Sequence, residues 1–552
     1  MEQSECVCVC KLTSHLAQKS ALMKKSFWFL FCAGLAAAIA GCSHFGGEWN
    51  ATRTAPPLDL IAQIHFAGAE KISTGTNSVA FTNLFCSSEA QALREQTLNK
   101  LARAPYQFLR SRMSPDAHDE AAHLRPLLDD LLHAEWFLQI RDATNGSPEF
   151  ALAVCLDKNR TQLWRTNLAN ILEFWTKLSV EKIHGGWQMK KHLPPDLIRF
   201  VRVGDWIVLG CGQEELPLND EIFRRVLAEK RPAPVAENCW LSADLDWRRL
   251  ARWFTPPDKF DLPEMQLQVV GSGNNLQMAG KFIFPQPLDL PLEKWRIPTN
   301  TIREPFISFT AVRGFAPWLE KQRWVRPFKI EPTPDQVFVW ALDQIPFQTF
   351  AAVPVPDATN AIRQLGGNLS ATLGKDFQHP ALGLLTLVTN DNEIAWRGFP
   401  FISPFVQNVR EPAGDFLLAG LFPNSPDSGP LPPELFATLA PANLVFYHWE
   451  ITAERLPEVR NLSQFALMFA QCDQLDGKSA AAKWLDRIGP TLGNAVTTIT
   501  QTAPDELTFT RKAPGGLIAI EFVALANWLE ATNFPLGRFQ LPALPKTNSL
   551  QP

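Results

Sequence analysis

Pairs of short apolar runs joined by glycine-containing turns constrain the fold of this chain most strongly. A two-residue turn with Gly204 separates Leu197–Val203 from Trp206–Leu209, and a five-residue stretch that begins Gly271-Ser272-Gly273-Asn274 separates Met265–Val270 from Leu276–Phe284. Two such runs joined by a short turn are typical of an antiparallel hairpin, because the turn brings the second strand back beside the first. The sequence therefore predicts antiparallel sheet in at least these two places.

Helical periodicity is found in the part of the chain that precedes these two hairpins. Apolar residues recur every three or four positions over Glu89–Leu109, over Glu120–Leu132 and over residues 163–178, which predicts three amphipathic helices. Strands and helices do not alternate regularly, as they do in a doubly wound parallel fold. We therefore expect an α+β fold of antiparallel sheets with packed helices, built from two or more related modules.

A Pro-rich segment, Pro285–Pro298, divides the chain. Proline cannot donate to a sheet ladder or continue a helix, so such a segment is typical of a linker. It predicts a boundary between an N-terminal α+β module, residues 58–290, and a C-terminal α+β module, residues 299–552. Both halves contain strands, a helix and a hairpin in succession, which favours an ancient duplication, although no residue-level repeat is visible.

The N-terminus has the pattern of an export signal. Lys24 and Lys25 precede the charge-free run Phe27–Ala40, which closes with Ile39-Ala40-Gly41-Cys42. A basic start, an apolar stretch of about 7–15 residues and small residues at the exit define a secretory signal. A helix that spans a bilayer needs about 20 apolar residues, so the run is short for a permanent anchor. Residues 1–41 are predicted to be removed.

Ile39-Ala40-Gly41-Cys42 resembles the lipobox of bacterial lipoproteins, in which small residues precede an invariant cysteine. The resemblance implies that cleavage occurs before Cys42, that its sulfur carries a diacylglyceryl group, and that the new amino terminus is acylated, usually with palmitate. Two or more acyl chains hold a protein stably on a membrane, whereas one does not. In this family an aspartate after the cysteine favours retention at the inner membrane. Ser43 stands there, which favours the outer membrane.

Two further segments flank the signal. Residues 42–57 are rich in Gly, Asn, Thr, Ala and Pro and are expected to form a tether. Residues 1–22 contain Cys6, Cys8 and Cys10 and make the basic region unusually long. We interpret Met23 as the true start and residues 1–22 as a gene-start error. A metal-binding or palmitoylated cysteine cluster is the alternative.

Charge excludes one class of partner. The chain has 52 basic and 56 acidic side chains, and loss of four Lys and two Glu with residues 1–41 leaves 48 against 54. Nucleic-acid binding depends on concentrated positive charge, so no nucleic-acid partner is expected. The balance of the whole chain also gives no electrostatic reason to bind anionic lipid. The predicted membrane attachment is therefore through the N-terminal lipid.

No pattern for a cofactor, a metal or an acyl-transfer site is present. The sequence lacks a P-loop, a dinucleotide fingerprint and the pentapeptide Gly-x-Ser-x-Gly. His118, His123 and His133 surround an acidic helix, but a five-residue spacing turns the first two away from each other. Cys155 and Cys211 lie in apolar strands, and we interpret them as buried free thiols, with a disulfide between them as the alternative. No cofactor and no metal are predicted.

Tryptophan use is unusual, with 18 Trp against 2 Tyr. Trp stacks on sugars and lines apolar pockets, whereas Trp inside a periodic apolar stretch is typically core. Four Trp are interleaved with arginines and are predicted to be more exposed, either in a ligand groove or in packing between modules. They are Trp247, Trp253, Trp318 and Trp324.

These observations favour a lipid-anchored, exported envelope protein with a non-catalytic binding or scaffolding role and an unidentified protein or glycan partner. Two alternatives stay open. One is a carrier with an apolar cavity for lipid or acyl chains. The other is an exported hydrolase acting on glycans or peptides, since paired carboxylates cannot be recognised in a single sequence.

Overall fold

The computed structural model describes residues 60–535, apart from short gaps in the chain. The gaps are 76, 78, 110–120, 143–147, 192–195, 214, 237, 252–261, 303–304, 323–324, 326–327, 344–347, 380–382, 401, 423–432, 470–474 and 533. The chain divides into two compact units, Met1–Pro285 with Trp528–Gly537, and Gln286–Asn527 with Arg538–Pro552. The division falls inside the Pro-rich segment. The leader, Cys42 and the tether lie outside the described residues.

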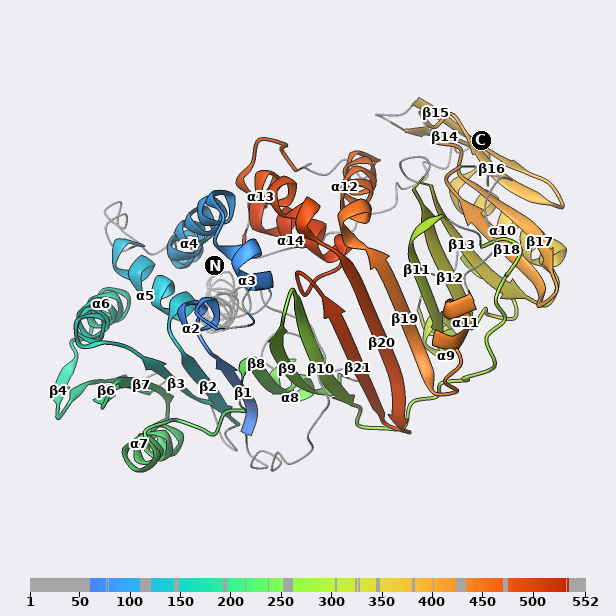
Figure 1. The fold of residues 1–552 in the computed structure, drawn as a ribbon. Coiled ribbons are helices and arrows are strands. Elements are labelled where there is room, and N and C mark those ends of the chain that lie inside the picture. Colours follow the sequence, from blue (N-terminus) through green and yellow to red (C-terminus); the bar gives the residue numbers. More distant parts are fainter. Residues whose placement is uncertain are drawn as a thin grey trace, which may run out of the picture. The chain divides into compact units, whose positions relative to one another are not determined.

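The strands of the first unit form one extended antiparallel sheet (Figure 1). Its order is β4-β5-β6-β7-β3-β2-β1-β8-β9-β10. The predicted hairpins are confirmed as β6–β7 and β9–β10. The strands are β1 (Leu60–Phe66), β2 (Trp136–Arg141), β3 (Glu149–Cys155), β4 (Glu181–Ile183), β5 (Gly186–Lys190), β6 (Leu197–Val203), β7 (Trp206–Gly212), β8 (Cys239–Asp246), β9 (Glu264–Ser272) and β10 (Asn275–Ile283).

Helices cover only part of this sheet. Helix α7 (Pro217–Glu229) places Leu218 and Ile222 against Phe137 and Ala153 of the sheet. Gly210 permits this approach, because a Cβ there would lie 2.6 Å from the side chain of Asn219. The other helices are α2 (Ala69–Ser73), α3 (Val79–Phe85), α4 (Ser88–Leu109), α5 (Ala121–His133), α6 (Lys158–Thr176) and α8 (Trp247–Ala251).

The second unit also has one extended antiparallel sheet. Its order is β14-β15-β16-β17-β18-β13-β12-β11-β19-β20-β21. The strands are β11 (Phe306–Arg313), β12 (Gln336–Leu342), β13 (Thr349–Val355), β14 (Asp376–His379), β15 (Gly383–Thr389), β16 (Glu393–Arg397), β17 (Phe405–Glu411), β18 (Gly414–Gly420), β19 (Leu444–Ile451), β20 (Asn494–Ala503) and β21 (Glu506–Ala513).

Among the described residues, apolar clusters pack the helices and strands of this unit. One contains Phe309, Phe338 and Trp340 of the central strands. Another packs Ile362 of α10 against Ile394 of β16. The helices are α9 (Ala316–Glu320), α10 (Ala358–Leu373), α11 (Pro433–Thr438), α12 (Thr452–Phe469), α13 (Ala480–Ile488) and α14 (Ala519–Glu530).

The two units share one strand order. The run β10-β9-β8-β1-β2-β3-β7-β6-β5-β4 corresponds, strand by strand, to β21-β20-β19-β11-β12-β13-β18-β17-β16-β15. Helix insertions also correspond, since α6 follows β3 as α10 follows β13, and α7 follows β7 as α11 follows β18. The same chain path is therefore followed twice.

The predicted α+β class, with several antiparallel sheets and packed helices, is wrong. Strands dominate, and within each unit every described strand joins a single extended sheet. Two hairpins, β6–β7 and β17–β18, pair through their second strand with a distant strand, as β7 does with β3 and β18 with β13, so they join the large sheet and do not form small sheets of their own. The alternation of apolar and polar residues along a stretch of sequence can indicate a strand, but it does not indicate which other strand will pair with it. The sequence also predicts a strand over the apolar run Leu517–Phe522, and this prediction is wrong, because Ala519–Phe522 form the start of α14.

Within the part of the chain that the structure describes, no helix is long and apolar enough to cross a bilayer.

Candidate functional site

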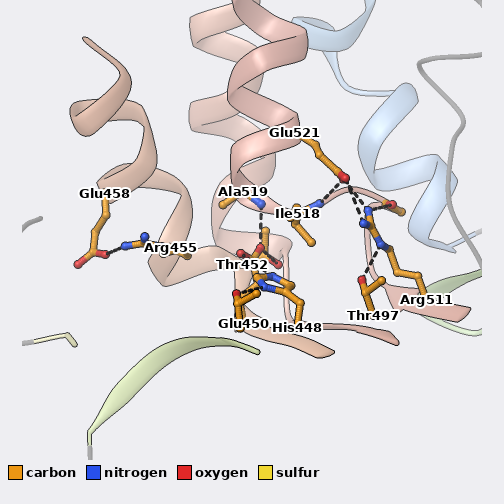
Figure 2. A network of polar contacts seen from close by, with 12 residues as sticks. His448, Glu450, Thr452, Arg455, Glu458, Thr497, Arg511, Ile518, Ala519 and Glu521 are labelled. Atoms are coloured by element: carbon orange, nitrogen blue, oxygen red, sulfur yellow. Dashed lines mark hydrogen bonds and ion pairs between the residues drawn. The ribbon is translucent and has the colours of Figure 1, made fainter. Parts of the chain in front are cut away.

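Four polar side chains form a row across the second unit's sheet. The strand register places Thr310 of β11 opposite His448 of β19, His448 opposite Thr497 of β20, and Thr497 opposite Arg511 of β21. Residues that lie directly opposite each other in an antiparallel pair project from the same face. The row therefore lies on one face, and its contacts reach α12 and α14 (Figure 2).

His448 stands between a hydroxyl and a carboxylate. Its Nδ1 lies 2.8 Å from Thr310 Oγ1, and its Nε2 lies 3.3 Å from Glu450 Oε2. His448 and Glu450 are both buried. His448 Nε2 makes no hydrogen bond with the described residues, so Glu450 is only close to it. A hydroxyl, an imidazole and a carboxylate close together are nevertheless the elements of an activated nucleophile, because the imidazole can accept the hydroxyl proton.

The carboxylate of Glu450 also has a structural task. Its Oε1 accepts hydrogen bonds from Thr452 Oγ1 at 2.9 Å and from the backbone N–H of Ala519 at 2.8 Å. Ala519 is the first residue of α14, where backbone N–H groups have no partner within the helix. A negative charge there is stabilised by the helix dipole. Glu450 therefore fixes the start of α14 on the sheet.

A second carboxylate acts on the same helix end. Arg511 and Glu521 form a two-pronged ion pair, with Nη1–Oε2 at 2.5 Å and Nη2–Oε1 at 3.0 Å. Arg511 Nε donates to Thr497 Oγ1 at 2.7 Å, and Glu521 Oε2 accepts from the Ile518 N–H at 3.0 Å. Two parallel hydrogen bonds between a guanidinium and a carboxylate are strong and also fix the relative orientation of the two side chains. It connects β20, β21 and α14.

Helix α12 is attached to the sheet by a hydrogen bond from Arg455, which also forms an ion pair with Glu458 within the helix. Arg455 Nη1 lies 2.6 Å from Glu458 Oε2 and donates to Thr349 Oγ1 of β13 at 3.1 Å. Burial raises the pKa of Glu458 by more than the hydrogen bond and charge of Arg455 lower it. The polar contacts in Figure 2 thus attach two helices to one sheet.

The first unit has its own His–Glu pair, formed by buried His65 and half-buried Glu135. His65 Nε2 lies 3.0 Å from Glu135 Oε1, which also meets Arg231 Nη2 at 2.6 Å, while Lys71 Nζ lies 3.5 Å from Oε2. Burial raises the pKa of Glu135, but the hydrogen bond from His65 and the charges of Arg231 and Lys71 outweigh it and lower the pKa to about 2. Burial lowers the pKa of His65, whose ring stacks on Phe137 at 4.4 Å.

Glu149 repeats in the first unit what Glu450 does in the second. This β3 carboxylate accepts from the backbone N–H groups of Leu218 and Asn219, both at 3.0 Å, in the first turn of α7. Burial raises its pKa more than these two hydrogen bonds lower it. In both units, a strand carboxylate therefore holds the N-terminus of a covering helix.

The predicted tryptophans fall in separate places. Trp247 begins α8 in the first unit and is 41% exposed, and Trp318 lies in α9 of the second unit and is 55% exposed. Trp253 and Trp324 lie outside the described residues. The ligand groove stays a prediction.

The histidine and cysteine candidates are also placed. Among the described residues, no three His, Cys, Asp or Glu are grouped to hold a metal ion, and His118 lies outside this set. Cys155 and Cys211 are free thiols, as are the other described cysteines. The alternative of a bridge between them is wrong, because the register pairs Cys155 with Trp206 and Cys211 with Phe150, at opposite ends of β3 and β7.

The His448–Glu450 network was missed in the sequence. A signal for it exists, since Tyr447-His448-Trp449-Glu450 alternates polar and aromatic residues within an apolar strand. Alternation with period two places both polar residues on one face.

No protein-family model, no curated protein and no solved structure matches this chain.

Proposed function

We propose that the chain is an exported, lipid-anchored envelope protein with a non-catalytic binding or scaffolding role. The observation that carries this proposal is Cys42, which follows Ile39-Ala40-Gly41 at the end of a charge-free run behind two lysines. Diacylglycerol on the Cys42 sulfur and an acyl chain on the new amino terminus together hold a protein stably on a bilayer. Ser43 favours the outer membrane as the destination.

The use of the buried carboxylates supports a non-catalytic role. Glu149 and Glu450 each accept hydrogen bonds from the first turn of a covering helix, and Glu521 accepts one from Ile518 next to α14. A carboxylate engaged in this way is a poor general base, because proton uptake would weaken the capping hydrogen bonds.

Metabolic labelling with palmitate tests the proposal. The wild-type chain should incorporate label and sediment with membranes, and Cys42→Ala should do neither. Cys32→Ala is the matched control, because Cys32 lies in the same leader and is predicted to be removed with it. Equal labelling of Cys42→Ala and the wild-type chain contradicts the proposal.

The second candidate is an exported hydrolase, favoured by the line of Thr310, His448 and Glu450. In this case Thr310 Oγ1 attacks the substrate while His448 takes its proton. A fluorophosphonate probe should then label the wild-type chain and Thr310→Ser but not Thr310→Ala. Absence of Thr310-dependent labelling removes this candidate.

A further inference from the structure

One face of the first unit's sheet carries polar side chains on its inner strands. The register places Gln268 of β9 opposite Ser242 of β8, and Ser242 opposite His65 of β1. Opposite residues of an antiparallel pair project from one face, and so do residues two positions apart on a strand. A second row therefore shares this face, formed by Gln266, Asp244, Gln63 and Gln139. We call the two rows the amide face.

The second unit has aromatic residues where the first unit has the amide face. The bulges at residues 60–62 of β1 and 306–308 of β11 occupy the same place in the shared strand order, which aligns Gln63 with Phe309. The register then aligns Gln139, Asp244 and Ser242 with Trp340, Trp449 and Tyr447. All four aromatic residues belong to, or pack against, a buried apolar cluster. The shared fold therefore accepts an apolar core here, and it does not require polar side chains.

Two buried acceptors on the amide face have no hydrogen-bond partner among the described residues. Gln139 is 3% exposed, and its Nε2 donates to Gln63 Oε1 at 2.7 Å, whereas its Oε1 has no partner. His65 is 2% exposed, and its Nδ1 has no partner either. The Glu135 carboxylate can only accept, so the neutral ring carries its proton on Nε2 and Nδ1 is an acceptor. Diagonal neighbours on paired strands are about 7–8 Å apart, so one ligand can reach both acceptors.

The amide face is close to neutral. Its members are four Gln, one Asp, one His and one Ser, with no Lys or Arg. Burial lowers the pKa of His65 by more than Glu135 raises it, so the ring is neutral at pH 7. Gln63, Gln266 and Gln268 are half-buried, and the amides of the last two make no hydrogen bond with any described residue. These properties favour a neutral ligand with many hydrogen-bonding groups over an ion.

We propose that the amide face is a binding site for a neutral glycan, whose hydroxyl groups donate to Gln139 and His65 and pair with the neighbouring amides. Hydroxyl groups donate and accept, and buried acceptors are costly when they have no donor. An extended polypeptide fits less well, because β8 and β1 are paired on both sides and offer no free edge for strand addition. The inference rests on the proposed binding role and deepens it by naming the class of ligand.

Titration calorimetry with neutral hexasaccharides tests the site. The full chain is purified as the cell produces it, in a detergent without a sugar headgroup. The probes are linear hexamers of glucose, mannose, galactose and N-acetylglucosamine. At least one probe should bind with a Kd of about 1 mM or tighter, and salt should change this Kd little because no charge is paired.

Gln139→Leu separates binding from folding. Leucine removes the acceptor without a partner and is apolar, as Trp340 is at the aligned position, so the melting temperature should rise or stay unchanged. Affinity for the bound probe should fall at least about tenfold, because the buried donor–acceptor pair is lost. Gln268→Leu should also weaken binding. Gln407→Leu is the matched control, a half-buried strand glutamine of the second unit, and should change the Kd by less than about twofold.

The proposal is overturned if none of the four probes binds, or if Gln139→Leu and Gln407→Leu bind equally well. Water alone then satisfies the two acceptors. If Gln139→Leu does not fold, the comparison of Gln268→Leu with Gln407→Leu decides in the same way. Failure of the proposed function is distinguishable, because palmitate labelling reports on Cys42 whatever the probes do. A labelled chain that binds no probe refutes the glycan site alone.

Discussion

Replacement of Glu450 by alanine should release the start of α14 from the sheet. Glu450 is 2% exposed, and its Oε1 is the acceptor for the Ala519 N–H and the Thr452 hydroxyl. Each buried donor left without its acceptor costs about 1–3 kcal/mol. Two such donors give about 3 kcal/mol, which corresponds to roughly 100-fold more frequent local opening at about 1.4 kcal/mol per tenfold.

Hydrogen exchange followed by mass spectrometry measures this opening directly in peptides from Ala519–Glu530. Glu450→Gln should give an intermediate increase, because its amide oxygen can still accept from Ala519. Glu454→Ala is the control, since Glu454 is exposed in the first turn of α12 and surface substitutions change stability by about 0.5 kcal/mol or less. Similar exchange of α14 in Glu450→Ala and Glu454→Ala would refute the capping role.

Three further outcomes are expected. The Glu135 pKa of about 2 lies below its ordinary 4.5, so its ionisation stabilises the fold above pH 4.5 and this contribution is lost as the pH falls towards 2. Glu135→Gln should therefore lower the melting temperature at pH 7 more than at pH 3. Gly186→Ala should destabilise the fold strongly, because its Cβ would lie 1.7 Å from a facing carbonyl oxygen. Gly367→Ala, in open space on α10, should stabilise the fold by about 1 kcal/mol. Denaturant titration measures both changes. Burial raises the pKa of Cys211 to about 12, so iodoacetamide should modify exposed Cys86 and spare Cys211 in the native chain, as peptide mass spectrometry would show.

Local elements were predictable where the apolar period was long. The helix predicted over Glu120–Leu132 is α5, and the hairpin predicted around Gly204 is β6–β7. The path of the sheet was not predictable, because β3 pairs with β7 and β11 pairs with β19 across long stretches of chain. The sequence predicts a strand at the start of α14, because Leu517–Ile520 is an apolar run that is too short to show a helical period.

The polar network around Glu450 was harder to predict from the sequence than the strands on which it lies. Alternation along β19 reports that His448 and Glu450 share a face, but the partners of Glu450 depend on where α14 docks. Thr310 lies 138 residues before His448, so only the strand register brings them together. Spacing in one sequence contains no information on such a register.

The intact mass of the protein purified from membranes tests the central claim most directly. The account predicts a chain that begins at Cys42 and carries a diacylglyceryl group on sulfur, with a further acyl group on the new amino terminus. A mass that includes residues 23–41 and an unmodified Cys42 would contradict it.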